Sequence, residues 1–132
     1  MNRRQILRQN MRNLRSALTP PEAEHLSGLI CKALEEVYLL QSAQNIMVYD
    51  AIQQEVSLNS YWYEQKRLGK RILLPRVKGD ILEAVEYTDW QNVARGPFGI
   101  REPIGEAFSP GEIDAVLVPG LVFDYNGNRL GY

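Results

Sequence analysis

The chain has 132 residues, enough for one domain, and its 15 Lys and Arg against 16 Asp and Glu give a formal net charge of −1. Its 45% hydrophobic and 23% charged residues are ordinary for a soluble globular protein. The single cysteine excludes an intrachain disulfide framework, and no apolar run reaches the length of a membrane span or a signal peptide, so we expect a cytoplasmic protein.

Residues 3–18 are predicted to form a helix, because apolar residues recur at helical spacing on one stripe. This stripe comprises Leu7, Met11, Leu14 and Leu18. Five arginines stand ahead of the first acidic residue, Glu22: Arg3, Arg4, Arg8, Arg12 and Arg15. We expect the helix to dock by its leucines and to present arginines beside the dock, where they could bind an anion. A solvated basic face is the alternative, unless a second anion-binding element lies nearby.

A second helix is predicted to begin at the capping box Thr19-Pro20-Pro21-Glu22 and to run to about Leu40. Its apolar residues form a wide stripe of the kind that packs on a sheet. His25 and Cys31 lack the partners that a metal ligand, a general base or a reactive thiol would need. We therefore interpret this helix as scaffold and expect no metal ligand in it.

The next segment predicts a strand at 45–49, a helix at about 57–68 and a strand at 71–75. A strand, helix and strand in this order imply parallel pairing, and ligands of parallel sheets collect beyond the carboxyl ends of the strands. Asp50 and Glu55 fall in that zone. A further, partly exposed strand is predicted at 81–87.

The turn-rich segment 96–103 carries Phe98, which could either stack against a flat ligand or fold back on the core as a plug. Residues 113–118 are predicted to form the most hydrophobic strand. After it comes a corner at Asn126-Gly127 and the glycine-punctuated segment 127–132, and such a loop often binds an anion. No complete phosphate-binding motif or metal-ligand cluster is present in the sequence. The residues alone thus indicate one α/β domain over 1–132, with an anion site near both termini.

The order of short motifs along essentially the whole chain matches a known family. These motifs are Arg4-Gln5-Ile6-Leu7-Arg8, Leu18-Thr19-Pro20-Pro21-Glu22, Glu55-Val56, Gly69-Lys70-Arg71, Leu74-Pro75-Arg76, Gly99-Ile100-Arg101-Glu102-Pro103, residues 114–124 and Asn128-Arg129-Leu130-Gly131-Tyr132. The last two are the most specific. On these motifs the chain resembles the 5-formyltetrahydrofolate cyclo-ligases, also called methenyltetrahydrofolate synthetases.

The resemblance implies a mainly parallel sheet flanked by helices in a three-layer, Rossmann-like arrangement, with the C-terminal part of the family fold missing. It also implies that ATP and Mg²⁺ are used to close 5-formyltetrahydrofolate into 5,10-methenyltetrahydrofolate, through a phosphorylated formyl intermediate and with release of ADP and phosphate. A small-molecule substrate and no nucleic acid or membrane partner are expected. Self-association through the truncated edge of the sheet is a further expectation.

Individual roles follow from the same resemblance. The resemblance implies a catalytic role for Arg129 and substrate contacts for Asp50, Glu55 and Phe98. The ATP contacts are Arg4, Gln5, Ile6, Leu7, Arg8, Arg129, Leu130, Gly131 and Tyr132. Relatives commonly have lysine at the position of Arg4, and their loop continues into a Gly-Tyr-Tyr-Asp motif that holds magnesium, so no metal ligand is expected in this chain.

Two other functions remain open from the sequence. The chain could be a catalytically inactive folate- or anion-binding fragment of that fold. Alternatively, the arginine helix could serve nucleic acid or a protein partner, although the balanced charge of the chain argues against nucleic acid.

Overall fold

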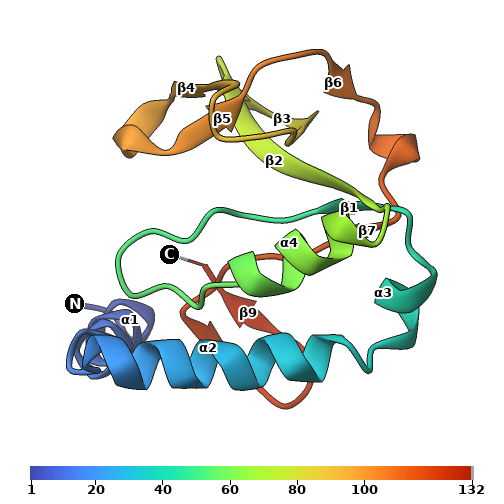
Figure 1. Ribbon diagram of the computed structural model, residues 1–132. Helices are drawn as coiled ribbons and strands as arrows, with labels where there is room; N and C mark the ends of the chain where they lie inside the picture. Colours follow the sequence, from blue (N-terminus) through green and yellow to red (C-terminus); the bar gives the residue numbers. More distant parts are fainter. Residues whose placement is uncertain (132) are drawn as a thin grey trace.

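The computed structural model describes residues 1–131 and combines four α-helices with nine short strands (Figure 1). The helices are α1 (Arg3–Ser16), α2 (Pro20–Leu34), α3 (Tyr38–Ser42) and α4 (Asn59–Arg67), with 3₁₀ turns η1 (Pro97–Gly99) and η2 (Pro110–Glu112). The strands are β1 (Asn45–Met47), β2 (Arg71–Lys78), β3 (Ile81–Glu86), β4 (Val93–Arg95), β5 (Arg101–Pro103), β6 (Ala107–Phe108), β7 (Ala115–Val116), β8 (Val122–Phe123) and β9 (Arg129–Leu130). Among residues 1–131, no helix has the length and apolar character needed to cross a membrane.

The central sheet has the strand order β6-β3-β2-β1-β7. Strand β1 pairs in parallel with both β2 and β7, whereas β2 with β3 and β3 with β6 pair antiparallel. The predicted β1-α4-β2 crossover is confirmed, and so is the α/β class with a sheet flanked by helices. Helix α4 packs against β2, and α2 packs against α4, as Figure 1 shows. Two ribbons, β4–β5 and β8–β9, lie outside this sheet.

The core forms where α4 meets β1 and β2. Trp62 on α4 is completely buried, as are Ile46 on β1 and Ile72 on β2. Burying an aromatic side chain of this size removes a large apolar area from water and dominates the local packing. The parallel half of the sheet and α4 therefore form the rigid base from which the loop after β1 extends.

Helix α1 docks by a different face from the one predicted. Leu14 is 64% exposed and Leu7 is also exposed, and no α1 side chain is fully buried. The partly buried positions of α1 are Arg8, Met11 and Arg15, a stripe rotated from the predicted one that shares only Met11 with it. Arg8 on this face donates a hydrogen bond to the backbone carbonyl of Gly131, so a polar contact with a distant segment helps to set which face turns inward.

Two predicted elements are shorter in the structure. The helix expected to run to Leu40 ends at Leu34, and after a turn the short helix α3 begins at Tyr38. The strand expected over 113–118 is reduced to β7, with Val116 and Val118 half exposed. Strand β7 is the edge of the sheet and pairs only with β1 among the described residues, which limits how far its ladder extends.

Candidate functional site

A cavity of about 480 Å³ lies between the two ends of the chain. We call it the terminal cavity, and it is lined by Arg4, Leu7, Arg8, Val122, Phe123, Asp124, Asn128, Arg129, Leu130 and Gly131. Arg8 Nε donates a hydrogen bond to the carbonyl oxygen of Gly131 at 2.6 Å. Arg129 Nη1 donates to the carbonyl oxygen of Pro119 at 2.7 Å. The basic helix and the C-terminal ribbon are thus two walls of one basic cavity.

The turn of the β8–β9 ribbon is held by the carboxylate of Asp124. It accepts hydrogen bonds from the backbone N–H groups of Asn126 and Asn128, both at 2.9 Å, and from Asn128 Nδ2 at 2.8 Å. The side-chain and backbone hydrogen bonds from Asn128 lower the pKa of Asp124. Gly127 supplies the left-handed corner with φ of +83°. This local network orients Arg129 and Gly131 toward α1.

The structure brings together most of the residues expected to contact ATP. Arg4, Leu7, Arg8 and the segment 129–131 all line the terminal cavity. Gln5 and Ile6 do not line it: Gln5 closes the N-terminal capping box with Asn2, and Ile6 is exposed. The helical position of Ile6 points it away from the face that carries Arg4 and Arg8. Tyr132 lies outside the described residues.

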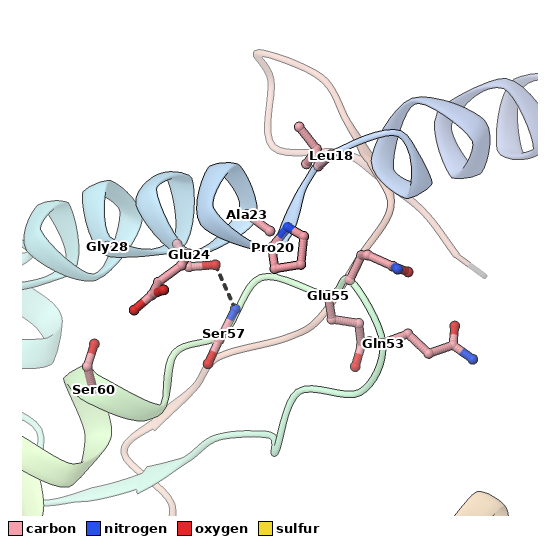
Figure 2. A pocket seen from close by; sticks show the side chains of 11 residues that line it. Leu18, Pro20, Ala23, Glu24, Gly28, Gln53, Glu55, Ser57 and Ser60 are labelled. Carbon is pink, nitrogen blue, oxygen red and sulfur yellow. Dashed lines mark hydrogen bonds between the residues drawn. The ribbon is translucent and has the colours of Figure 1, made fainter.

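A second and larger cavity, of about 600 Å³, lies beside the loop that follows β1 (Figure 2). We call it the loop cavity, and it is lined by Leu18, Pro20, Ala23, Glu24, Ser27, Gly28, Gln53, Gln54, Glu55, Ser57 and Ser60. Ser57 N donates to Ser27 Oγ at 3.0 Å, the dashed contact in Figure 2, and this joins the loop to α2. Two carboxylates and no lysine or arginine line the cavity, so it suits a group with hydrogen-bond donors.

Glu55 is fixed by its own loop. Its Oε1 accepts a hydrogen bond from the backbone N–H of Ile52 at 2.9 Å. Gln53, between them, has φ of +52°, a left-handed conformation that costs energy for a residue other than glycine. The tight turn places Glu55 on the wall of the loop cavity.

A smaller cavity of about 280 Å³ lies on the other side of the same loop. We call it the bridging cavity, and it is lined by Arg12, Arg15, Ser16, Ile52, Gln53, Gln54 and Glu55. The arginine face of α1 therefore extends from the terminal cavity to Glu55. The helical spacing of these arginines is visible in the sequence, but the position of the 52–55 loop beside Arg12 and Arg15 is a tertiary feature that spacing does not predict.

Asp50 does not line any of these three cavities. Its Oδ2 accepts from Arg101 Nε at 2.9 Å, and its Oδ1 accepts from Arg101 Nη2 and Asn59 Nδ2, each at 3.1 Å. The Asp50 side chain is only 9% exposed. Both of its oxygens are thus engaged within the protein. Its main partner is Arg101, which no spacing in the sequence pointed to.

The exposure of Phe98 decides whether this side chain packs on the core, a question that the sequence left open. Its side chain is 94% exposed, so it is not a plug on the core. It belongs to η1, between β4 and β5, and has φ of +60°. A large apolar side chain held out into solvent on a strained backbone is available to contact a ligand. It lines none of the three cavities defined above.

Comparison with known proteins gives a consistent result. The model of the family described as the 5-formyltetrahydrofolate cyclo-ligase family matches residues 1–132. The chain is 24% identical to a probable 5-formyltetrahydrofolate cyclo-ligase of Caenorhabditis elegans, covering 96% of the chain and 66% of that protein. It is 31% identical to the 5-formyltetrahydrofolate cyclo-ligase of Mycolicibacterium smegmatis, covering 97% of the chain and 67% of that protein.

A solved structure is similar as well. The chain matches the 5,10-methenyltetrahydrofolate synthetase of Aquifex aeolicus with a TM-score of 0.86 and 28% identity. The match covers 98% of this chain and 66% of that one. The chain therefore spans about two thirds of the length of the relatives it matches.

Proposed function

Because the chain belongs to the 5-formyltetrahydrofolate cyclo-ligase family, we propose that it acts in the ATP-dependent cyclisation of 5-formyltetrahydrofolate to 5,10-methenyltetrahydrofolate. The observation that carries this proposal is the terminal cavity, where Arg4, Arg8 and Arg129 converge from opposite ends of the chain. Guanidinium groups are suited to phosphate oxygens because they offer charge and several N–H donors in a planar fork. The terminal cavity is our proposed nucleotide site.

The proposed reaction includes a phosphoryl transfer, which a site lined by arginines can assist. The formyl oxygen is a poor leaving group until the γ-phosphoryl group of ATP is transferred to it, which breaks the bond to ADP. The second folate nitrogen then attacks the activated carbon, and the C–O bond breaks to release phosphate. Phosphoryl transfer depends mainly on positioning and on neutralising charge. We assign these tasks to Arg8 and Arg129, with Arg4 as an additional phosphate contact.

Glu55 is our proposed contact to the folate. It lies on the wall between the loop cavity and the bridging cavity, and a carboxylate can accept hydrogen bonds from the amino and ring N–H groups of a pterin. Arg12 and Arg15 line the bridging cavity and connect this wall with the nucleotide site along α1. Phe98 is proposed to lie against the flat part of the substrate.

Magnesium has no ligand set in the part of the chain that the structure describes. Residues 1–131 contain no group of three or more His, Cys, Asp or Glu side chains placed to hold a metal ion.

A second candidate function is folate or anion binding without turnover. The observation that favours it is that the terminal and loop cavities are both formed by described residues and offer contacts suited to an anion and to a group with hydrogen-bond donors. The two candidates differ in their products but share their ligands.

Formation of the methenyl product, followed by absorbance with 5-formyltetrahydrofolate, ATP and magnesium, separates the two candidates. Product formation that depends on ATP supports cyclo-ligase activity. Binding of both ligands by calorimetry without any product supports the binding function. A chain that binds neither ligand contradicts both.

A further inference from the structure

A two-pronged ion pair between Asp50 and Arg101 ties together two segments that are separate in the fold. Asp50 lies just beyond β1, at the start of the loop that carries Glu55. Arg101 begins β5, in the ribbon that carries Phe98 at its tip. The guanidinium meets both carboxylate oxygens, through Nε at 2.9 Å and Nη2 at 3.1 Å. The loop and the ribbon are therefore held in one relative position.

Side chains from other elements contact both members of this ion pair. The Arg101 guanidinium lies over the ring of Trp90, 3.5 Å from its centroid. On the other side, Asn59 Nδ2 donates to Asp50, and Asn59 Oδ1 accepts from Trp62 Nε1 at 3.2 Å. Trp62 belongs to the core, so the chain of contacts runs from the buried base of α4 to the ribbon. Hydrogen bonds to Asp50 raise the pKa of Arg101 above its ordinary value, so it stays charged.

Other contacts of the ribbon leave its outer part exposed. Within the described residues, strands β4 and β5 pair only with each other in the sheet sense, while Glu102 on β5 accepts a hydrogen bond from Val77 N on β2 at 2.9 Å. The 3₁₀ turn η1 at their tip projects Phe98 into solvent. Such a short ribbon is marginal by itself and depends on contacts with the rest of the fold. Arg101 provides one such contact next to the tip.

We propose that Arg101 is a positioning residue for folate, and that Asp50 acts by holding Arg101 rather than by touching the substrate. The pair sets where Phe98 stands relative to Glu55, so that both can meet one ligand. This inference rests on the proposed function, since the ligand is the substrate of that reaction. It reassigns the carboxylate that resemblance to the family had placed against folate.

Lysine can replace Arg101 only in part. Its ammonium is a point charge that can neither span both oxygens of Asp50 nor stack flat on Trp90. The ion pair is also expected to add little to the stability of the fold, because the desolvation free energy of burying it largely offsets the attraction between the charges. A function in placing the ribbon accounts for its geometry better.

The test compares the unmodified chain with Arg101→Ala, Arg101→Lys and the control Arg67→Ala, which removes the exposed ion pair with Glu64. Calorimetry gives the Kd for 5-formyltetrahydrofolate and for ATP, and hydrogen exchange reports on residues 93–103. We expect Arg101→Ala to weaken folate binding about tenfold and to raise hydrogen exchange in residues 93–103. The folate affinity of Arg101→Lys should lie between those of the unmodified chain and Arg101→Ala. The ATP affinity of each variant and both affinities of the control should stay unchanged.

Each outcome has one meaning. Unchanged folate affinity in Arg101→Ala, or unchanged exchange in 93–103, overturns the inference while the proposed function stands. Equal losses for ATP and folate identify a general structural defect and also overturn it. Should Arg101→Ala fail to fold, the folate-to-ATP ratio of Arg101→Lys decides the question. If the unmodified chain binds ATP but no folate, the proposed function fails, and the inference fails with it.

Discussion

Arg8 and Gly131 are 123 positions apart in the sequence, yet Arg8 Nε lies 2.6 Å from the carbonyl oxygen of Gly131. A carbonyl carries no net charge, so this contact fixes the guanidinium without neutralising it. Gly131 follows β9 directly, so this contact joins α1 to the C-terminal ribbon. The contact therefore closes the terminal cavity and leaves its positive charge available to an anion.

Arg4 offers a test of charge against geometry in this cavity. Arg4→Ala should weaken ATP binding by about tenfold or more, because it removes a charged donor to phosphate. Arg4→Lys should stay within about threefold of the unmodified chain, because lysine keeps the charge and is a common phosphate ligand. Calorimetric titration of ATP measures both. Equal losses in the two variants would show that fork geometry, rather than charge, matters at this position.

Glu55→Gln tests the proposed folate contact with little change of shape. The glutamine carbonyl can still accept the hydrogen bond from Ile52, so the turn should persist, and only the negative charge is lost. We expect folate affinity to fall about tenfold, in line with the loss of a charged acceptor. ATP affinity serves as the internal control and should not change. An unaltered Kd for folate would remove Glu55 from the site.

Asp114 links the start of β1 to the β7 edge, and its effect on stability should depend on pH. Its Oδ2 accepts from the backbone N–H groups of Asn45 at 2.8 Å and Gln44 at 3.0 Å, and these bonds lower its pKa below the ordinary 3.8. A lowered folded-state pKa stabilises the fold above the unfolded-state value, and this contribution is lost as the pH falls through the folded-state value.

The corresponding measurement is the denaturant midpoint of the unmodified chain and of Asp114→Asn between neutral and strongly acidic pH. Asp114→Asn should be the less stable of the two at neutral pH. The difference should shrink as the pH falls below about 3.8, where the unfolded-state carboxylate takes up its proton. A difference that stays constant across this range would mean that the hydrogen bonds do not depend on the charge of Asp114.

Local sequence signals were sufficient for the parallel half of the fold. The apolar runs of β1 and β2, separated by a helical pattern, predicted the crossover that the structure contains. The docking face of α1 was not predictable in this way, because a leucine stripe shows only which face could be buried. Whether Leu14 or Arg8 turns inward depends on the C-terminal ribbon, which is distant in sequence.

The candidate site was also predictable from the sequence only in part. Motif order placed Arg8 and Arg129 near each other, and the terminal cavity contains both. The partner of Asp50 was not foreseen, since Arg101 reaches it through the fold of the β4–β5 ribbon rather than through any spacing in the chain. Nor could the sequence decide between an exposed and a buried Phe98, because either outcome suits an aromatic residue in a turn-rich segment.

The central claim is that both ends of this chain form one nucleotide site, and calorimetric titration of ATP into the unmodified chain and Arg8→Ala tests it most directly. The control is Arg67→Ala, which removes an exposed arginine on α4 far from the cavity lining. We predict that ATP binds the unmodified chain and the control alike, and that Arg8→Ala binds at least about tenfold more weakly. Equal affinity in all three proteins would contradict the claim.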